Sequence, residues 1–162
     1  MTTPLIWPPH FSQAEMQFSE KAARAGIVNV CPQKLIHNLL SVADWLEVLR
    51  ARLAIETGRQ YPIRVISGYR SAAVNKLVGG SKTSAHMQGC AADIVIPGMS
   101  VDDLFAFIRQ HMSGEGWDQI IHEFGSWVHV GLAERDERGQ CLKAVKKARP
   151  WPLKPETVYI QV

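Results

Sequence analysis

Hydrophobic periodicity changes along this chain of 162 residues: helical patterns dominate the first part, and strand patterns dominate the second. The longest helical pattern covers residues 33–56, where apolar side chains recur on one face: Ile36, Leu39, Leu40, Ala43, Leu46, Leu49 and Leu53. A helix of this kind must bury that face against another layer. Helices followed by hairpin-linked strands predict an α+β fold, with helices packed on one face of a mostly antiparallel sheet.

Shorter segments complete this prediction. The capping box of Ser12 with Glu15 starts a helix that Gly26 ends. Further helices are expected over 71–77 and 100–111. Strands are expected over 63–67, 91–96, 117–124 and 127–132, the last two joined around Gly125-Ser126 as a hairpin.

The length is most simply that of one domain, residues 1–162, and the composition, 46% hydrophobic and 20% charged, is typical of globular proteins. Residues 1–10 are expected to be an extended arm, and 133–162 a basic, Pro-containing tail that ends in an edge strand over 157–162. Apolar runs are too short for a membrane-spanning helix of ~20 residues, so stable membrane insertion is not expected. The N-terminus lacks the pattern of a signal peptide, which predicts synthesis in a cytoplasm.

The net charge of +3 has its basic excess near the C-terminus, at Lys143, Lys146, Lys147, Arg149 and Lys154. This excess is either a solvated basic surface or an attraction to an anionic polymer. We expect no nucleic-acid partner, because no recognition helix, zinc finger or aromatic RNA-binding motif is present. We expect a monomer.

Ligand-type side chains interrupt two of the predicted strands. Asp93 lies among apolar residues, where a carboxylate is costly unless it is paired or bound to a metal. Val128 and Val130 share one strand face, so His129 lies on the other. Together with His86, seven residues before Asp93, these residues predict a metal site.

Zinc suits this set, because it accepts imidazole nitrogen and carboxylate oxygen and leaves one position for water in catalytic sites. Two histidines and a carboxylate also describe non-haem iron sites, and the residues alone do not separate the two metals. Cys90 competes as a ligand. A cysteine-containing zinc site usually has more than one thiolate, however, and along an extended strand Cys90 faces away from Asp93. The three cysteines, Cys31, Cys90 and Cys141, are expected to be free thiols.

Three segments together carry a resemblance: Ser67-Gly68-Tyr69-Arg70, the pattern SxHxxGxAxD over Ser84 to Asp93, and Trp127-Val128-His129. They resemble the zinc D-Ala-D-Ala carboxypeptidase family, and more closely its compact phage and prophage peptidoglycan-peptidase (endolysin) branch, over roughly residues 11–132. The resemblance implies a hedgehog/DD-peptidase-like fold, with Zn²⁺ held by His86, Asp93 and His129. It also implies hydrolysis of amide bonds in peptidoglycan stem peptides, as a DD-carboxypeptidase or an endopeptidase.

The resemblance implies two catalytic residues. Arg70 would polarise the scissile carbonyl, and Glu123 would move a proton from the attacking water to the leaving amine. Turn chemistry leaves the second role open, because a two-residue Gly125-Ser126 turn would place His122 beside the metal instead. A three-residue loop over 124–126 would place Glu123 on the face of His129. Many relatives carry a histidine where this chain has Trp127, so one auxiliary polar group is missing.

An enzyme of this kind would be made in a bacterial host cytoplasm and would act on the periplasmic cell wall once another protein opens the membrane. The rival hypothesis is a non-catalytic zinc-binding module, or a virion-associated structural protein with the same fold. The presence of Arg70 and Glu123 argues against it. Iron-dependent oxygenation would need a 2-oxo acid site, which the sequence does not reveal.

Overall fold

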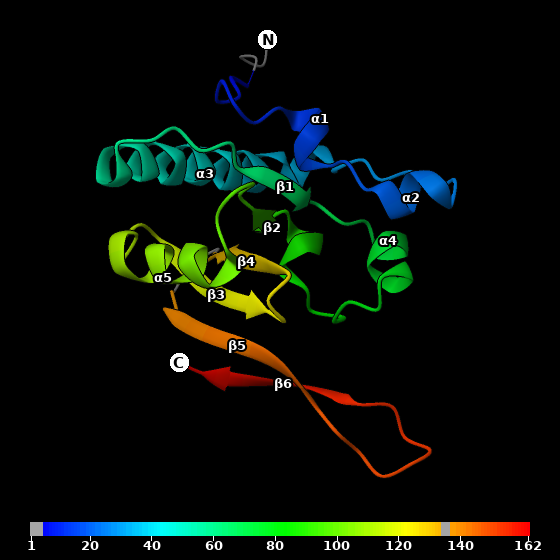
Figure 1. The fold of residues 1–162 in the computed structure, drawn as a ribbon. Coiled ribbons are helices and arrows are strands. Elements are labelled where there is room, and N and C mark those ends of the chain that lie inside the picture. Colours follow the sequence, from blue (N-terminus) through cyan, green and yellow to red (C-terminus); the bar gives the residue numbers. More distant parts are fainter. Residues whose placement is uncertain (1–4, 134–136) are drawn as a thin grey trace.

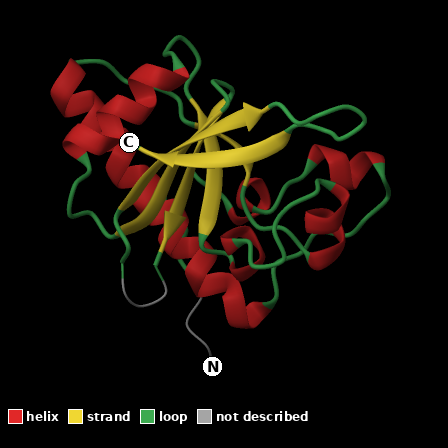
Figure 2. Ribbon diagram, turned by 90° about the horizontal axis from the view of Figure 1, so that it is seen from below, coloured by secondary structure: helices red, strands yellow, loops and turns green. Residues whose placement is uncertain are grey.

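One six-stranded sheet organises the protein (Figures 1 and 2), whose computed structural model describes residues 5–133 and 137–162. The strand order is β1-β2-β4-β3-β5-β6. The strands are β1 (Arg64–Ser67), β2 (Ala91–Val95), β3 (Trp117–Glu123), β4 (Trp127–Leu132), β5 (Gln140–Lys147) and β6 (Glu156–Gln161). All neighbouring strands are antiparallel except β3 and β5, which are parallel. The predicted α+β fold with a mostly antiparallel sheet is thereby confirmed.

Helices flank this sheet. They are α1 (Gln13–Met16), α2 (Glu20–Arg24), α3 (Ile36–Thr57), α4 (Ala72–Leu77) and α5 (Val101–His111), with 3₁₀ turns η1 (Gln33–Leu35) and η2 (Ala85–Gln88). In Figure 1, α3 lies at the β1–β2 end of the sheet and α5 lies beside β3 and β4. No helix among the described residues is both long and apolar enough to cross a membrane.

The core lies between the sheet and the long helices. Ile94, Ile120, Val128 and Val130 are fully buried in one cluster with the apolar face of α3 and with Leu104 and Ile108 of α5. The opposite face of the same strands carries Asp93 and His129, because neighbouring side chains alternate along a strand. The sheet therefore has one face that forms the core and one face that carries the polar side chains.

The N-terminal helix prediction was partly wrong. Ser12 caps α1 as predicted, with its Oγ accepting from the backbone N–H of Glu15 at 3.2 Å. The helix ends at Met16, however, and Ser19 starts a second helix by accepting from the N–H of Ala22, also at 3.2 Å. A serine inside a helical pattern can cap a new helix instead of continuing the old one.

The C-terminal segment differs more from expectation. Its end is an edge strand, β6, as predicted, but residues 140–147 also form a strand, β5, which lies beside β3. The lysines at 143, 146 and 147 interrupt the apolar alternation that identifies a strand. The two strands form a hairpin that projects at the lower end of the sheet in Figure 1. Residues 134–136 of the predicted tail, and residues 1–4 of the predicted arm, lie outside the described residues.

The turn between β3 and β4 has three residues. Glu123 pairs with Trp127 and His122 pairs with Val128, so the two-residue turn that Gly125-Ser126 favours does not form. Phe124 and Gly125 both have positive φ, 54° and 70°. The glycine accommodates this conformation at no steric cost, and the longer loop sets which side chains of β3 share the face of His129.

Candidate metal centre

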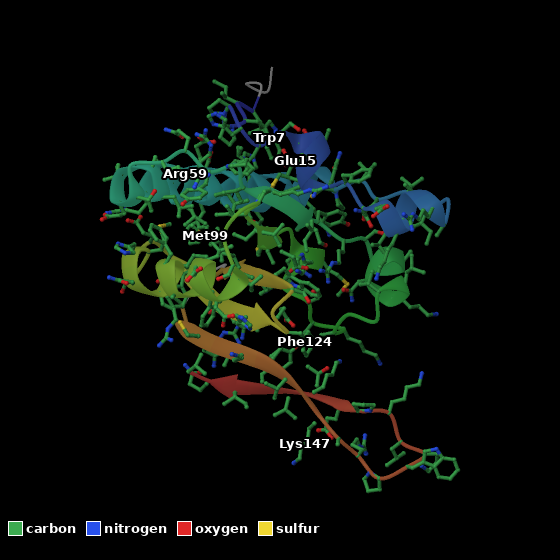
Figure 3. The ribbon with its side chains drawn as sticks, in the orientation of Figure 1. Trp7, Glu15, Arg59, Met99, Phe124 and Lys147 are labelled. Atoms are coloured by element: carbon green, nitrogen blue, oxygen red, sulfur yellow. The ribbon has the colours of Figure 1, made fainter. Side chains whose placement is uncertain are left out.

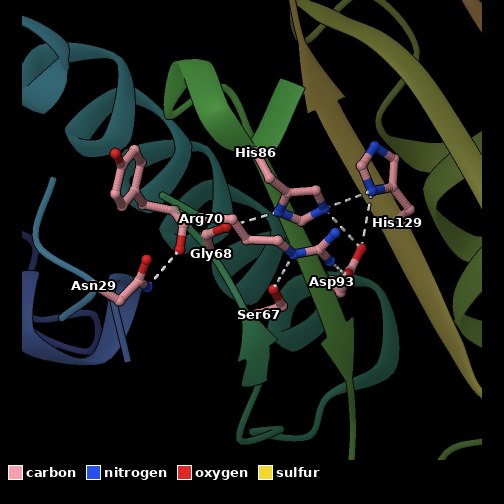
Figure 4. Close-up of polar contacts among 8 residues, drawn as sticks. Asn29, Ser67, Gly68, Arg70, His86, Asp93 and His129 are labelled. Atoms are coloured by element: carbon pink, nitrogen blue, oxygen red, sulfur yellow. Dashed lines mark hydrogen bonds and ion pairs between the residues drawn. The ribbon is translucent and has the colours of Figure 1, made fainter. Parts of the chain in front are cut away.

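Three ligand atoms converge on the polar face of the sheet (Figure 4). Nε2 of His86 lies 3.2 Å from Oδ1 of Asp93 and 3.1 Å from Nδ1 of His129. The same Asp93 oxygen lies 2.9 Å from Nδ1 of His129. His86 comes from η2, Asp93 from β2 and His129 from β4, and pairing of Asp93 with His129 across β2 and β4 brings the two strand residues together. The three residues form a group that could hold a metal ion.

The protonation of His86 fits a cation at this point. Its Nδ1 lies 2.7 Å from the carbonyl oxygen of Gly68, to which it must donate. Burial lowers the pKa of His86, and the Asp93 carboxylate acts in the opposite direction. A neutral ring that donates from Nδ1 to Gly68 would present at Nε2 the lone pair that a metal ligand needs, and this nitrogen faces Asp93 and His129. Tetrahedral zinc with bonds of ~2.0–2.1 Å separates its ligand atoms by about 3.3 Å, close to the distances here.

Asp93 uses its two oxygens differently. Oδ1 faces the histidines, and Oδ2 pairs with Nη2 of Arg70. Burial raises the pKa of Asp93, but the interactions with His86 and His129 outweigh burial and hold the pKa well below its usual range. The carboxylate is therefore ionised and available as a metal ligand. Nε of Arg70 donates to Oγ of Ser67 at 2.8 Å, which fixes the guanidinium from a second side.

A backbone turn after β1 holds these groups in place. Gly68 packs so closely on α1 that a Cβ there would lie 2.0 Å from the carbonyl oxygen of Met16. The next residue, Tyr69, donates its N–H to the same oxygen at 2.8 Å. Asn29 bridges this turn by donating to the Tyr69 carbonyl at 2.9 Å (Figure 4). Its side-chain oxygen also accepts from the Ser71 N–H at 2.8 Å. The turn thus orients both Arg70 and the Gly68 carbonyl that anchors His86.

Glu123 lies on the ligand face of β3. It pairs with Trp127, which is two residues before His129 on β4. Among the described residues its carboxylate has no hydrogen bond or ion pair. Burial raises the pKa of Glu123, the negative charge of Asp93 acts in the same direction, and His129 and Arg70 act in the opposite one. A partly buried, uncommitted carboxyl near a metal centre can exchange a proton.

His122 faces the other side of the sheet. Its ring packs edge-on against Phe105 of α5, with centroids 5.7 Å apart. Its Nε2 lies 3.2 Å from Oδ1 of Asp102, without the geometry of a hydrogen bond. Of the two candidates left open by the turn chemistry, only Glu123 therefore shares the face of His129.

A cleft opens beside the three converging residues. It has a volume of about 330 Å³ and is lined in part by Ser67, Arg70, Asp93 and Trp127. Its far side is formed by α2 and α4, which lie next to each other. A second hollow of about 320 Å³ lies around His10 and is lined by none of the ligand-type residues at 86, 93 and 129. Trp127 thus lines the cleft, a position that its strand face allowed.

The chain matches the family Peptidase M15 over residues 9–131. Because the match covers most of the chain, this protein belongs to the Peptidase M15 family. Members of this family are zinc metallopeptidases, which agrees with the convergence of His86, Asp93 and His129. A search of curated proteins found no match.

The sequence did not identify several residues that belong to the site. Ser67 and Asn29 act only through contacts with residues that are distant along the chain, and the Gly68 carbonyl acts through its backbone. A short polar residue three positions before an arginine is too common to be a signal. Strand β5, which lies next to Glu123 on β3, was also missed, because its lysines obscure the strand pattern.

Proposed function

We propose that this protein is a zinc-dependent peptidase that hydrolyses amide bonds in peptidoglycan stem peptides, as a DD-carboxypeptidase or an endopeptidase. Its biological role would be that of a phage or prophage endolysin. The observation that carries this proposal is the meeting of His86, Asp93 and His129 on one sheet face, with the uncommitted carboxyl of Glu123 on the same face. The two histidines and the aspartate would hold Zn²⁺. When bound, zinc lowers the pKa of its water to ~7 and acts as a Lewis acid on a carbonyl.

Glu123 would be the general base and then the general acid. Burial raises the pKa of Glu123, which is toward the range in which a side chain both accepts and releases a proton near neutral pH. It would take a proton from the attacking water and deliver it to the leaving amine. Its pairing with Trp127, a residue that lines the cleft, supports this role, because the substrate amide would lie in that cleft.

Arg70 would bind the oxygen of the scissile carbonyl. Asp93 and Ser67 hold two of its nitrogens, Nη2 and Nε. The remaining N–H groups of the guanidinium have no partner among the described residues, and Arg70 lines the cleft. A fixed positive charge of this kind stabilises the oxyanion that develops during amide hydrolysis.

The site of action would be the periplasmic cell wall. The protein would be made in a bacterial host cytoplasm and would act as a monomer, without a nucleic-acid partner or stable insertion in a membrane. The rival function, a zinc-binding module or virion-associated structural protein without catalysis, has no observation in its favour. A module would need neither a buried, unpaired carboxyl at position 123 nor an arginine fixed in the cleft.

One experiment tests the proposal. Purified protein is incubated with peptidoglycan from a Gram-negative wall, with and without a chelator, and new termini are identified by mass spectrometry. We expect new amino and carboxyl termini that disappear with the chelator and return with added zinc, and their identity names the bond that is cleaved. A zinc-loaded protein that creates no new terminus in any purified wall would instead favour the non-catalytic module.

A further inference from the structure

The β5–β6 hairpin continues the sheet directly beside Glu123, although it lies outside the residues that match the family. One row of paired residues crosses four strands: Trp127, Glu123, Ala144 and Tyr159. Paired residues of neighbouring strands share a face. Tyr159 therefore lies on the face of the metal centre, separated from Glu123 by only the small side chain of Ala144.

Lys146 shares this face, because it lies two residues after Ala144 on β5. Its Nζ donates to Oγ1 of Thr157 at 2.8 Å and lies 4.6 Å from the centroid of the Phe124 ring. Phe124 is at the end of β3, beside the hairpin (Figure 3). Both neighbours hold the ammonium group over the face that carries Glu123.

The charge of Lys146 is not neutralised within the described residues. Lys143, on the opposite face of β5, lies 3.9 Å from Asp102, and Arg149 lies 3.8 Å from Glu156. Lys146 has no such carboxylate, and the hydroxyl of Tyr159 has no hydrogen-bond partner there. Two donors on the face of the metal centre are thus available to a ligand.

The electrostatics agree with this placement. Lys146 acts to lower the pKa of Glu123, against the larger effect of burial. The pKa of Tyr159 is raised, first by burial and then by the negative charges of Glu123 and Asp93. These directions agree with the placement of the half-exposed Tyr159 and the exposed Lys146 near Glu123, which the strand pairing gives.

We propose that Lys146 and Tyr159 form a subsite for a free carboxylate of the substrate peptide. This inference rests on the proposed function. An ammonium and a phenol hydroxyl are donors that suit an anionic oxygen. With strands ~4.8 Å apart, β5 lies about 10 Å and β6 about 14 Å from β4, and an extended peptide spans ~3.4 Å per residue. The carboxylate would then lie about three to four residues from the scissile bond.

The test compares Lys146→Ala with Lys147→Ala. These neighbours lose the same charge, but Lys147 lies on the opposite face of β5 and is the matched control. The substrates are synthetic stem peptides in which each free carboxylate in turn is amidated. We expect Lys146→Ala to raise KM about tenfold for the fully ionised peptide, with kcat changed less than twofold, and to abolish the preference over one amidated peptide. Tyr159→Phe should raise KM about threefold, and Lys147→Ala should change neither parameter.

A binding measurement separates the subsite from catalysis. Zinc-loaded Glu123→Gln protein, with and without Lys146→Ala, is titrated calorimetrically with the same peptides. Loss of the preference for the ionised peptide in the Lys146→Ala protein supports the subsite, even if turnover is too slow to follow. Equal behaviour of the 146 and 147 variants in cleavage and binding would overturn the subsite while leaving the peptidase intact. Failure of the intact protein to cleave or bind any stem peptide would overturn the proposed function itself.

Discussion

The guanidinium of Arg70 pairs with Oδ2 of Asp93, the carboxylate oxygen that does not face the two histidines. One side chain thus links the cleft to the candidate metal centre, because the same arginine that lines the cleft also orients Asp93, one of the three converging residues. The link is held from a third point by Oγ of Ser67. Groups that orient a metal ligand affect both metal affinity and activity when they are changed.

Arg70→Lys tests this link. A lysine keeps the positive charge but has a single nitrogen, so it cannot reach both Ser67 and Asp93. We expect kcat to fall about 10–100-fold and zinc affinity to fall by a smaller factor, measured by stem-peptide hydrolysis and by competition with a chromogenic chelator. Arg64→Lys on the exposed side of β1 is the control and should change neither. Full activity of Arg70→Lys would mean that the two-point contact is dispensable.

Glu123→Gln tests the base. The amide keeps the size of the side chain but cannot accept the proton, so kcat should fall about 10²–10⁴-fold. Zinc content should stay at one ion per chain, because Glu123 is not one of the three converging residues. His122→Gln is the matched control, since its side chain lies on the α5 face and its loss should leave kcat within about threefold. The reverse ranking of these two variants would assign the base to His122.

The same substitution should stabilise the metal-free protein. The folded-state pKa of Glu123 is raised above its unfolded value, so folding binds a proton and stability falls as pH rises from the unfolded pKa to the folded one. At pH 7 the wild type carries the penalty of a partly buried charge that Glu123→Gln does not. We expect Tm of the metal-free variant to exceed that of the wild type by about 1–3 °C at pH 7, and to match it at pH 4. A lower Tm for the variant at pH 7 would contradict the raised pKa.

Features of the fold and of the candidate site could be predicted where neighbouring residues in the sequence determine them, but not where they depend on contacts between residues far apart in the sequence. The face of α3 and the strand positions of Asp93 and His129 are local patterns, and the structure reproduces them. The contact of Arg70 with Asp93 joins residues 23 apart, and no local pattern encodes it. Strand β5 escaped prediction because its lysines face the solvent on both sides of a strand near the sheet edge, which obscures the alternation of apolar residues.

The turn between β3 and β4 shows a second kind of limit. Gly125-Ser126 is a good two-residue turn signal, yet Phe124 takes a positive φ of 54° and the loop has three residues. A residue with a large side chain seldom takes this conformation, so local preference points to the wrong register. The pairing of Ile120 and Ile121 with β4 settles the register instead, because it buries Ile120 with Val130 in the core. Core packing therefore decided that Glu123, and not His122, lies on the face of His129.

Zinc affinity of single-residue variants should distinguish the residues that bind the metal from those that only lie near it. We expect His129→Gln to lower zinc affinity more than about 100-fold, because one of three ligand atoms is lost. Cys90→Ser should bind zinc as the wild type does, since the thiol contacts the carbonyl of Gln88 and does not belong to the converging group. Metal content after dialysis against a weak chelator, measured by mass spectrometry, distinguishes the two. Loss of zinc from Cys90→Ser would restore the cysteine as a ligand.

Gly68→Ala should be the most damaging single-methyl change near the site. The added Cβ would meet the backbone oxygen of Met16 at 2.0 Å, so either α1 or the turn after β1 must move. We expect the free energy of unfolding to fall by about 2–4 kcal/mol in urea denaturation. Zinc affinity should fall as well, because the Gly68 carbonyl orients His86.

Gly79→Ala is the control. The φ of +71° at this position is unfavourable for alanine, but the added Cβ meets open space. The free energy of unfolding should therefore fall by about 1 kcal/mol, with zinc binding unchanged. Equal losses in the two variants would show that the contact with Met16 relaxes easily and does not hold the metal centre in place.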